Sequence, residues 1–295
     1  MDKMDWTQML QPLLTLALQL EREGQYNLAK LARAAVNSLG RRAAYQGPAP
    51  IGNEELVNAL SRASDSLALL EVGGQLIDAL RKGAVALAEG RIPAITDTPH
   101  PYVCRTCGNI VMGEVVEKCP VCGAWPDTFQ WFAPIYWLDA LDPPAALAKL
   151  RQTPLDVATL LDGLSEEAMI REPQDGGWAI RNIVTHMRDA QGVLDYRLDL
   201  FAQEDHPVLE SKAVWTWAKN EEESPPSTRE IFAEYQATRA KILARLDKLP
   251  LADWWRTGRH AEFGEVSIKQ QVSYFASHEI THLPQIEKLR MQNLS

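Results

Sequence analysis

The amino-acid sequence predicts a mainly α-helical protein in which two four-helix bundles flank a small β-ribbon that carries four cysteines. Apolar residues recur at three- and four-residue spacing in eight segments, which is the pattern of amphipathic helices. All four cysteines fall between positions 104 and 122. Eight of the nine tryptophans and all six phenylalanines lie at or beyond Trp125, so the two halves have different cores. A length of 295 residues fits two or three domains.

The composition excludes several classes of protein. No stretch approaches the roughly 20 consecutive apolar residues that span a bilayer. With 30 basic and 39 acidic residues, the net charge of −9 works against nonspecific binding to nucleic acid or anionic lipid. The start, Met1-Asp2-Lys3, lacks the basic segment and apolar run of a secretory signal. We therefore expect a cytoplasmic protein that binds neither nucleic acid nor membrane.

The first four predicted helices form two pairs. Glycines separate the helices within each pair, and Gly47-Pro48-Ala49-Pro50 separates one pair from the other. We expect a helical bundle over residues 1–95, structural in role and able to form a homodimer. The helices are predicted at residues 6–22, 25–44, 53–70 and 75–89.

A linker rich in proline, residues 92–101, leads into the cysteine segment. Short strands are predicted at Tyr102-Val103 and Ile110-Val111, within a metal-binding ribbon over residues 100–135. Helical periodicity returns after Asp142-Pro143-Pro144, which predicts the second bundle over residues 145–292. Its helices are expected at residues 145–164, 179–202, 228–249 and 267–291, the third starting at Ser227 or Thr228 with Glu230 following.

The cysteines form two similar C-x-x-C knuckles with eleven residues between the inner pair, and a glycine follows each second cysteine. Such a glycine permits a turn in which main-chain N–H groups approach sulfur. Four thiolates complete a tetrahedral shell, whereas two disulfides are not expected in a reducing compartment. The spacing alone leaves zinc and iron open. The predicted ligands are Cys104, Cys107, Cys119 and Cys122.

The segments Tyr102-Val-Cys-Arg-Thr-Cys-Gly and Glu117-Lys-Cys-Pro-Val-Cys-Gly-Ala, with Phe129, resemble the rubredoxin-like domain of rubrerythrins. The resemblance implies an iron centre on the four cysteines that transfers electrons to a redox partner protein. Asn109 stands where many rubredoxins have tyrosine, which leaves the ligands intact.

Upstream, Leu20-Glu-Arg-Glu-Gly-Gln-Tyr-Asn-Leu-Ala is similar to the start of rubrerythrin helical bundles, which are ferritin-like. A ferritin-like di-iron site needs glutamates and E-x-x-H pairs. No histidine precedes His100, and Leu39 and Arg42 stand where the family has its glutamate and histidine on the second helix. We therefore expect a bundle without di-iron ligands.

His278 and His282 form H-x-x-x-H on a predicted helix, so both imidazoles can reach one ion. The string also matches H-E-x-x-H of zinc proteases, with Glu279 as general base. The metzincin extension is absent, because Gln285 and Lys288 occupy its glycine and histidine places. Thirteen residues of the sequence follow His282, so we expect the third ligand to come from upstream. His186 is the candidate.

Three segments resemble the DinB/YfiT-like metalloprotein superfamily: Trp178-Ala-Ile-Arg-Asn-Ile-Val-Thr-His186, Gly264-Glu-Val-Ser-Ile, and His278-Glu-Ile-Thr-His282-Leu-Pro-Gln-Ile. The resemblance implies a four-helix bundle in which His186, His278 and His282 hold zinc, nickel or iron and leave positions open to a small-molecule substrate or thiol. Known relatives include thiol-dependent transferases and isomerases.

Other polar residues have two interpretations each. Glu279 is either the catalytic base or a carboxylate that orients a neighbouring helix, and we expect the second. His206 and His260 are expected to be exposed in loops. Arg239 is expected to pair with a local acid rather than with an anionic substrate. The tryptophans at 215 and 217 line a pocket mouth or pack in the core.

Three functions follow from these patterns. The first is a DinB-like metal-dependent transferase or isomerase that uses a small thiol. The second is rubredoxin-type electron transfer in oxidative stress. The third is a noncatalytic scaffold stabilised by metal. The identity and redox activity of the bound metals would discriminate among them.

Overall fold

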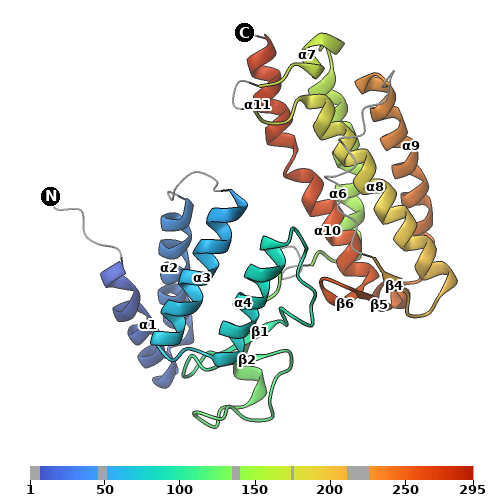
Figure 1. Cartoon of the computed structure of the whole chain (residues 1–295). Helices are drawn as coiled ribbons and strands as arrows, with labels where there is room; N and C mark the ends of the chain where they lie inside the picture. The colour runs from blue at the N-terminus through green and yellow to red at the C-terminus, as the bar shows by residue number, and fades with distance from the viewer. Residues whose placement is uncertain (1–6, 46–51, 135–139, 174–175, 211–225, 295) are drawn as a thin grey trace. The chain divides into compact units, whose positions relative to one another are not determined.

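The computed structural model describes residues 7–45, 52–134, 140–173, 176–210 and 226–294. The chain divides into two compact units, which we call the N-terminal unit (residues 1–93 and 97–131) and the C-terminal unit (residues 94–96 and 132–295). Helices make up most of the described residues, as predicted (Figure 1). No described helix has both the length and the apolar run that crossing a membrane requires.

The N-terminal unit begins with two helical hairpins. Helix α1 (Thr7–Arg22) packs against α2 (Tyr26–Tyr45), and α3 (Asn53–Leu69) packs against α4 (Gly74–Ala88). Gly24 has φ +70° in the first connection, a conformation that glycine adopts without strain. The side chains that these hairpins bury are mostly alanines, among them Ala17, Ala29 and Ala86.

The four predicted helices are therefore present, but extensive helix packing among the described residues is confined to each hairpin. The hairpins also leave large apolar side chains exposed, such as Leu31 and Leu69. The bundle expected over residues 1–95 stays a prediction. The contacts within each hairpin are made mostly by alanines and leave much of the leucine surface unburied. The periodicity that predicts the four helices therefore does not by itself predict how the two hairpins pack.

A three-stranded antiparallel sheet follows, with strand order β2-β1-β3. Strands β1 (Pro101–Cys104) and β2 (Ile110–Met112) correspond to the two predicted strands, whereas β3 (Phe129–Trp131) was not predicted. Tyr102 pairs with Val111 on one side and with Trp131 on the other. The short helix η1 (Pro126–Thr128) leads into β3, and α4 packs on β2.

The C-terminal unit is a helical bundle of α6 (Pro143–Leu161), α8 (Ile180–Gln203), α9 (Thr228–Leu246) and α10 (Ile268–Ile280), extended by α11 (Leu283–Leu294) and the short α7 (Glu166–Ile170). Helix α8 packs along α9, α10 along α6, and α11 also on α6 (Figure 1). Two buried apolar clusters fill the bundle. Ser227 and Glu230 form the predicted capping box at the start of α9.

The last predicted helix is divided in two, because α10 ends at Ile280 and α11 begins at Leu283. Pro284 explains the break, since it has no N–H to donate to the carbonyl of Ile280 and its ring crowds that carbonyl. A second small sheet, in the order β4-β5-β6, was also not predicted. It consists of β4 (Val208–Leu209), β5 (Thr257–His260) and β6 (Gly264–Ser267), with η3 (Leu251–Trp255) before β5.

Candidate metal centres

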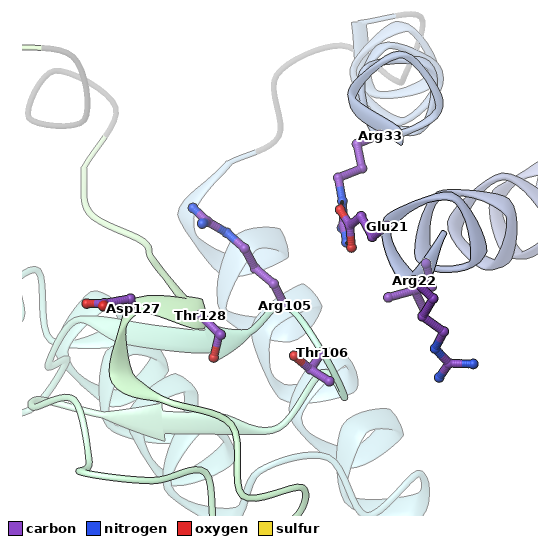
Figure 2. Close-up of a pocket in the computed structure, with 8 residues that line it drawn as sticks. Glu21, Arg22, Arg33, Arg105, Thr106, Asp127 and Thr128 are labelled. Atoms are coloured by element: carbon purple, nitrogen blue, oxygen red, sulfur yellow. Dashed lines mark hydrogen bonds and ion pairs between the residues drawn. The ribbon is translucent and has the colours of Figure 1, made fainter. Parts of the chain in front are cut away.

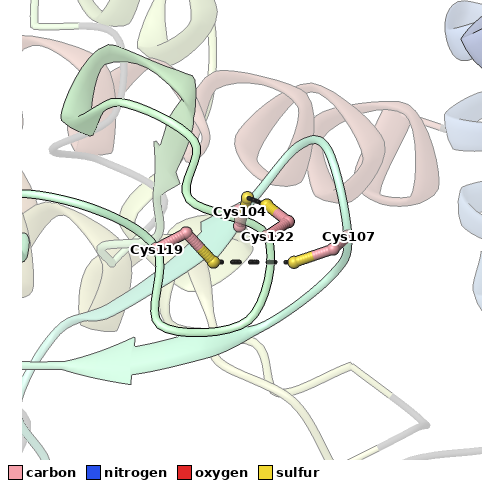
Figure 3. Close-up of side chains that lie close together, drawn as sticks. All are labelled: Cys104, Cys107, Cys119 and Cys122. Atoms are coloured by element: carbon pink, nitrogen blue, oxygen red, sulfur yellow. Dashed lines mark hydrogen bonds between the residues drawn. The ribbon is translucent and has the colours of Figure 1, made fainter.

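The four cysteines of the ribbon meet at one point (Figure 3). Their sulfur atoms all lie within 4.8 Å of one another. Cys104 Sγ is 3.7 Å from Cys122 Sγ, and Cys107 Sγ is 3.6 Å from Cys119 Sγ. A tetrahedral ion with metal–sulfur bonds of about 2.3 Å requires sulfur–sulfur separations of about 3.8 Å. The sulfur positions therefore fit a single tetrahedral metal ion.

Each knuckle folds back on itself in the same way. The N–H of Gly108 donates to the carbonyl of Cys104 at 2.8 Å, and that of Gly123 donates to the carbonyl of Cys119 at 2.8 Å. Both glycines have positive φ, 80° and 73°, which explains the sequence preference for glycine there. The two knuckles thus have equivalent backbone geometry.

Main-chain N–H groups point at the buried sulfurs. Burial alone would raise the pKa of the Cys104 thiol, but hydrogen bonds from the N–H groups of Cys107 and Thr106 outweigh it and bring the pKa to about 6. In the second knuckle, N–H groups of Cys122 and Val121 likewise overcome burial and lower the pKa of Cys119. The pKa values of Cys107 and Cys122 are raised instead, because burial and neighbouring thiols outweigh the N–H bonds that their sulfurs accept. The fold therefore favours thiolates, the form that binds metal, at Cys104 and Cys119.

The three predicted histidines converge in the C-terminal unit. His186 lies in the second turn of α8, His278 in the last turn of α10, and His282 in the turn between α10 and α11. His278 Nε2 lies 3.4 Å from His186 Nε2 and 3.4 Å from His282 Nε2. Ligand atoms about 2.05 Å from a tetrahedral ion are about 3.3 Å apart. The three Nε2 atoms therefore fit one ion.

The electrostatics keep His186 and His278 neutral, the form in which an imidazole binds metal. Burial, together with the charge of His282, lowers the pKa of His186 to about 4. Burial and the two neighbouring imidazoles lower the pKa of His278 to about 4. Protonation at neutral pH would place charges beside one another in a buried site, whereas a bound cation uses the lone pairs that neutral rings present.

Neighbouring side chains orient the rings. His282 Nδ1 lies 2.9 Å from Gln285 Oε1, so an Nδ1–H that donates to Gln285 leaves the Nε2 lone pair directed at the ion. The Tyr274 ring stacks on His278, with ring centroids 5.6 Å apart and planes 10° apart. Trp178, 40% exposed, lies against His186 with ring centroids 5.0 Å apart. The sequence pattern did not indicate this role for Gln285, which there only argued against a metzincin.

Glu279 takes part in a buried network that joins four helices. Arg239 Nη2 donates to Glu279 Oε1 at 2.6 Å, and the Tyr235 hydroxyl donates to Oε2 at 3.0 Å. Gln191 Nε2 also donates to Glu279, while Arg239 donates through Nη1 to the carbonyl of Leu150. Both carboxylate oxygens are thus occupied. This arrangement matches the helix-orienting interpretation and gives Arg239 the acid partner that was expected.

The other candidate residues have mixed outcomes. His206 is exposed and contacts Glu265 at 2.7 Å. The expectation for His260 was wrong, because it lies buried in β5 with 1% exposure. The sequence around it has no apolar alternation that would mark a buried strand. The tryptophans at 215 and 217 lie outside the described residues.

A cleft of about 400 Å³ adjoins the first knuckle in the N-terminal unit (Figure 2). Arg33 donates twice to Glu21, at 2.7 and 2.8 Å, and these bonds lower the pKa of that carboxyl. Arg105, between the first two cysteines, lines the same cleft with Asp127. A basic side chain therefore lies beside the cysteine site, which the motif alone did not indicate.

Comparison with known proteins points to the C-terminal unit. Residues 149–286 match the family model of the DinB superfamily. This part of the chain is DinB-like. It contains His186, His278 and His282, so the DinB-like region and the three-histidine cluster coincide. The rubrerythrin-like character of residues 1–135 stays a prediction.

Individual relatives cover the same half of the chain. A Geobacillus kaustophilus protein named “Putative metal-dependent hydrolase” is 27% identical over 145 residues, which are 49% of this chain and 82% of that protein. An Oceanobacillus iheyensis protein of the same name is 28% identical over 131 residues, 44% of this chain and 75% of that protein. The solved structure of YfiT from Bacillus subtilis, described as a probable metal-dependent hydrolase with an unusual four-helix bundle topology, is 17% identical, covers 55% of this chain and 93% of its own, and gives a TM-score of 0.48.

Proposed function

We propose that the C-terminal unit is a metal-dependent enzyme whose centre is built by His186, His278 and His282. The observation that carries this proposal is the convergence of three imidazoles, whose ligand nitrogens lie within 4.8 Å of one another, in a DinB-like region. When bound, a divalent ion supplies Lewis-acid chemistry, lowering the pKa of a nucleophile beside it and polarising an electrophile. Three protein ligands leave positions for these reactants.

The protein's own residues hold the ligand set and guard it from water. Gln285 fixes the tautomer of His282, and Tyr274 supports the ring of His278. Trp178 covers one side of His186. The network around Glu279 fixes α10 against α8 and α9, which helps His278 and His186 to keep their spacing.

We infer that the nucleophile is a low-molecular-weight thiol. Among described residues, the one carboxylate next in sequence to a ligand, Glu279, has both oxygens engaged by Arg239, Tyr235 and Gln191. Activation then falls to the metal ion. A thiol with an ordinary pKa of about 8.5 needs a small shift to be a thiolate at neutral pH, whereas water at about 15.7 needs a large one. Transfer or isomerisation through a thiol is thus favoured over hydrolysis.

The test is to purify the full chain without an affinity metal column, measure its metal content, and assay it with small thiols and electrophilic substrates before and after chelation. The expected result is thiol-dependent turnover that chelation removes and a divalent metal restores. Metal-dependent ester or amide hydrolysis without thiol would replace the transferase by a hydrolase. No reaction of either kind would favour the scaffold function.

A second function is favoured by the cysteine site. We infer that the ribbon holds iron, because each buried sulfur accepts main-chain N–H bonds that stabilise negative charge on sulfur. Electron transfer to a redox partner would then occur at this site. Protein from iron-replete cells should show visible thiolate-to-iron absorption that bleaches on reduction. A colourless zinc-loaded ribbon would instead make the site structural.

A further inference from the structure

Arg197 is a buried cation whose hydrogen-bond partners among the described residues carry no negative charge. Its side chain lies in α8 and is 6% exposed. Its guanidinium donates to Gln271 Oε1 at 2.6 Å and to the carbonyl of Glu210 at 2.9 Å, and it contacts His260 Nε2 at 2.8 Å. All three are neutral groups. The charge of Glu262 acts on Arg197 only from beyond these direct contacts, so the buried guanidinium can still be stabilised by a negative group in direct contact with it.

The site also has an excess of hydrogen-bond donors. Gln271 is 1% exposed, and its Nε2 finds no acceptor among the described residues. His260 Nδ1 accepts from the N–H groups of Glu262 and Phe263, at 3.1 and 3.3 Å. A neutral imidazole that accepts at Nδ1 carries its proton on Nε2, which then faces another donor, Arg197. An acceptor with several lone pairs is what this cluster lacks.

The electrostatics agree with this account. Burial lowers the pKa of Arg197 to about 10. Burial, followed by the charge of Arg197, lowers the pKa of His260 to about 3. Both groups are thus placed where added negative charge would be stabilising.

This cluster lies on the same helix faces as the histidine centre. Gln271 and His278 are seven residues apart on α10, which is about two turns and about 10 Å of rise. Arg197 and His186 are eleven residues apart on α8, about three turns and again the same face. Tyr274 lies between, because its ring stacks on His278 and its hydroxyl acts electrostatically on Arg197. Both clusters therefore lie along the interface between α8 and α10.

We propose that Arg197, Gln271 and His260 form an anion site for the carboxylate of the small molecule on which the histidine centre acts. Arg197 pairs with the carboxylate, and the Gln271 amide and the His260 N–H donate to its remaining lone pairs. The substrate class is then a carboxylate-bearing molecule whose reacting group lies about two helical turns from its charge. The role of this site in substrate binding rests on the proposed function. Its affinity for a carboxylate does not depend on bound metal.

The probe is acetate, compared with chloride at equal ionic strength, in thermal unfolding and calorimetric titration of the full chain. Acetate should stabilise the native protein, and chloride should not do so to the same extent. Gln271→Glu puts a carboxylate of the chain beside Arg197, so this variant should melt higher without acetate and bind acetate at least about tenfold more weakly. Arg197→Met should also lose the acetate effect.

Arg188→Gln is the matched control, because Arg188 also lies on α8 but already pairs with Asp189 and Glu234. It should keep the full acetate effect. The proposal is wrong if acetate and chloride act alike on the native protein, or if Gln271→Glu melts lower and binds acetate as before. If Arg197→Met does not fold, Gln271→Glu decides alone.

His186→Ala separates this proposal from the proposed function. It should abolish metal binding at the histidines but keep the acetate effect. A series of mercaptocarboxylates of increasing length should bind the metal-loaded protein more tightly than acetate, with this gain lost in His186→Ala. An acetate effect without any such gain would keep the anion site but overturn its link to the histidine centre.

Discussion

The two metal-ligand clusters are built in opposite ways. In the ribbon, Cys104 and Cys122 are 18 residues apart, and main-chain N–H groups of two tight turns hold the sulfurs. In the bundle, His186 and His278 are 92 residues apart on α8 and α10, and side chains rather than main-chain groups orient the rings of His278 and His282. A ligand set held by its own backbone depends on local sequence, whereas one held by side chains depends on the packing of the whole bundle. Substitutions should therefore act differently at the two centres.

The largest effect is expected at the ribbon. Cys119→Ser should abolish the ribbon metal and unfold the ribbon, because metal binding by small four-cysteine sites contributes on the order of 10 kcal/mol to folding. Elemental analysis should show one metal lost per chain while metal at the histidines remains. Val121→Ala, at an exposed position in the same knuckle, should keep the metal. A ribbon that retains metal and its near-ultraviolet dichroism in Cys119→Ser would refute a four-thiolate site.

The next effect concerns the network that holds the bundle centre. Glu279→Leu leaves the Arg239 guanidinium buried and unpaired, so the free energy of unfolding should fall by about 3–5 kcal/mol. The double variant Arg239→Met, Glu279→Leu should recover most of this loss. Glu265→Gln, which breaks an exposed contact with His206, should change stability by less than about 1 kcal/mol. A loss in Glu279→Leu no larger than in Glu265→Gln would contradict the account, as measured by denaturant unfolding.

The same contrast explains what the sequence could predict. The cysteine ligands, the helix positions and the Ser227 cap depend on neighbouring residues, and each was visible as a motif or a period. The pair of His278 and His282 was visible for the same reason. The partners of Glu279 and the burial of His260 depend on helices and strands far away in sequence. The strands β4 to β6 are two to four residues long, too short for alternation to mark them.

The third effect is a pH dependence of stability. His260 has a folded-state pKa of about 3, below the value of about 6.5 for an unfolded histidine, so the unfolded chain binds more protons between these values. Stability contributed by neutral His260 is full above pH 6.5 and is lost as the pH falls towards 3. Between pH 7 and pH 4 the loss should be about 3 kcal/mol.

His260→Gln should remove this part of the acid sensitivity, so its stability should fall less than that of the native protein over the same pH range. The comparison is made by urea unfolding at each pH. His206→Gln is the control, since the His206 side chain is exposed whereas His260 is buried. If the free energy of unfolding depends on pH in the same way in the native protein and in His260→Gln, then burial and Arg197 do not lower the pKa of His260.

A smaller effect is expected when one orienting contact of the histidine centre is removed. Gln285→Leu takes away the acceptor for His282 Nδ1, so metal affinity at the histidines should fall by about tenfold to hundredfold. Metal in the ribbon should be unchanged, because its sulfurs are oriented by backbone groups. Gln285→Glu keeps an acceptor and should restore the affinity. Equal affinities in Gln285→Leu and the native protein, by competition with a metal indicator, would remove Gln285 from the site.

The smallest effect is expected in the N-terminal hairpins. Leu31 in α2 is 60% exposed, so Leu31→Ala should change the free energy of unfolding by no more than about 0.5 kcal/mol. Leu150 in α6 is fully buried, and Leu150→Ala should cost about 2–5 kcal/mol. The measurement is denaturant unfolding of the full chain at several protein concentrations. If Leu31→Ala instead costs as much as Leu150→Ala, and its cost grows with protein concentration, the exposed leucines of the hairpins are covered in solution by a second copy, and the homodimer expected from the sequence follows.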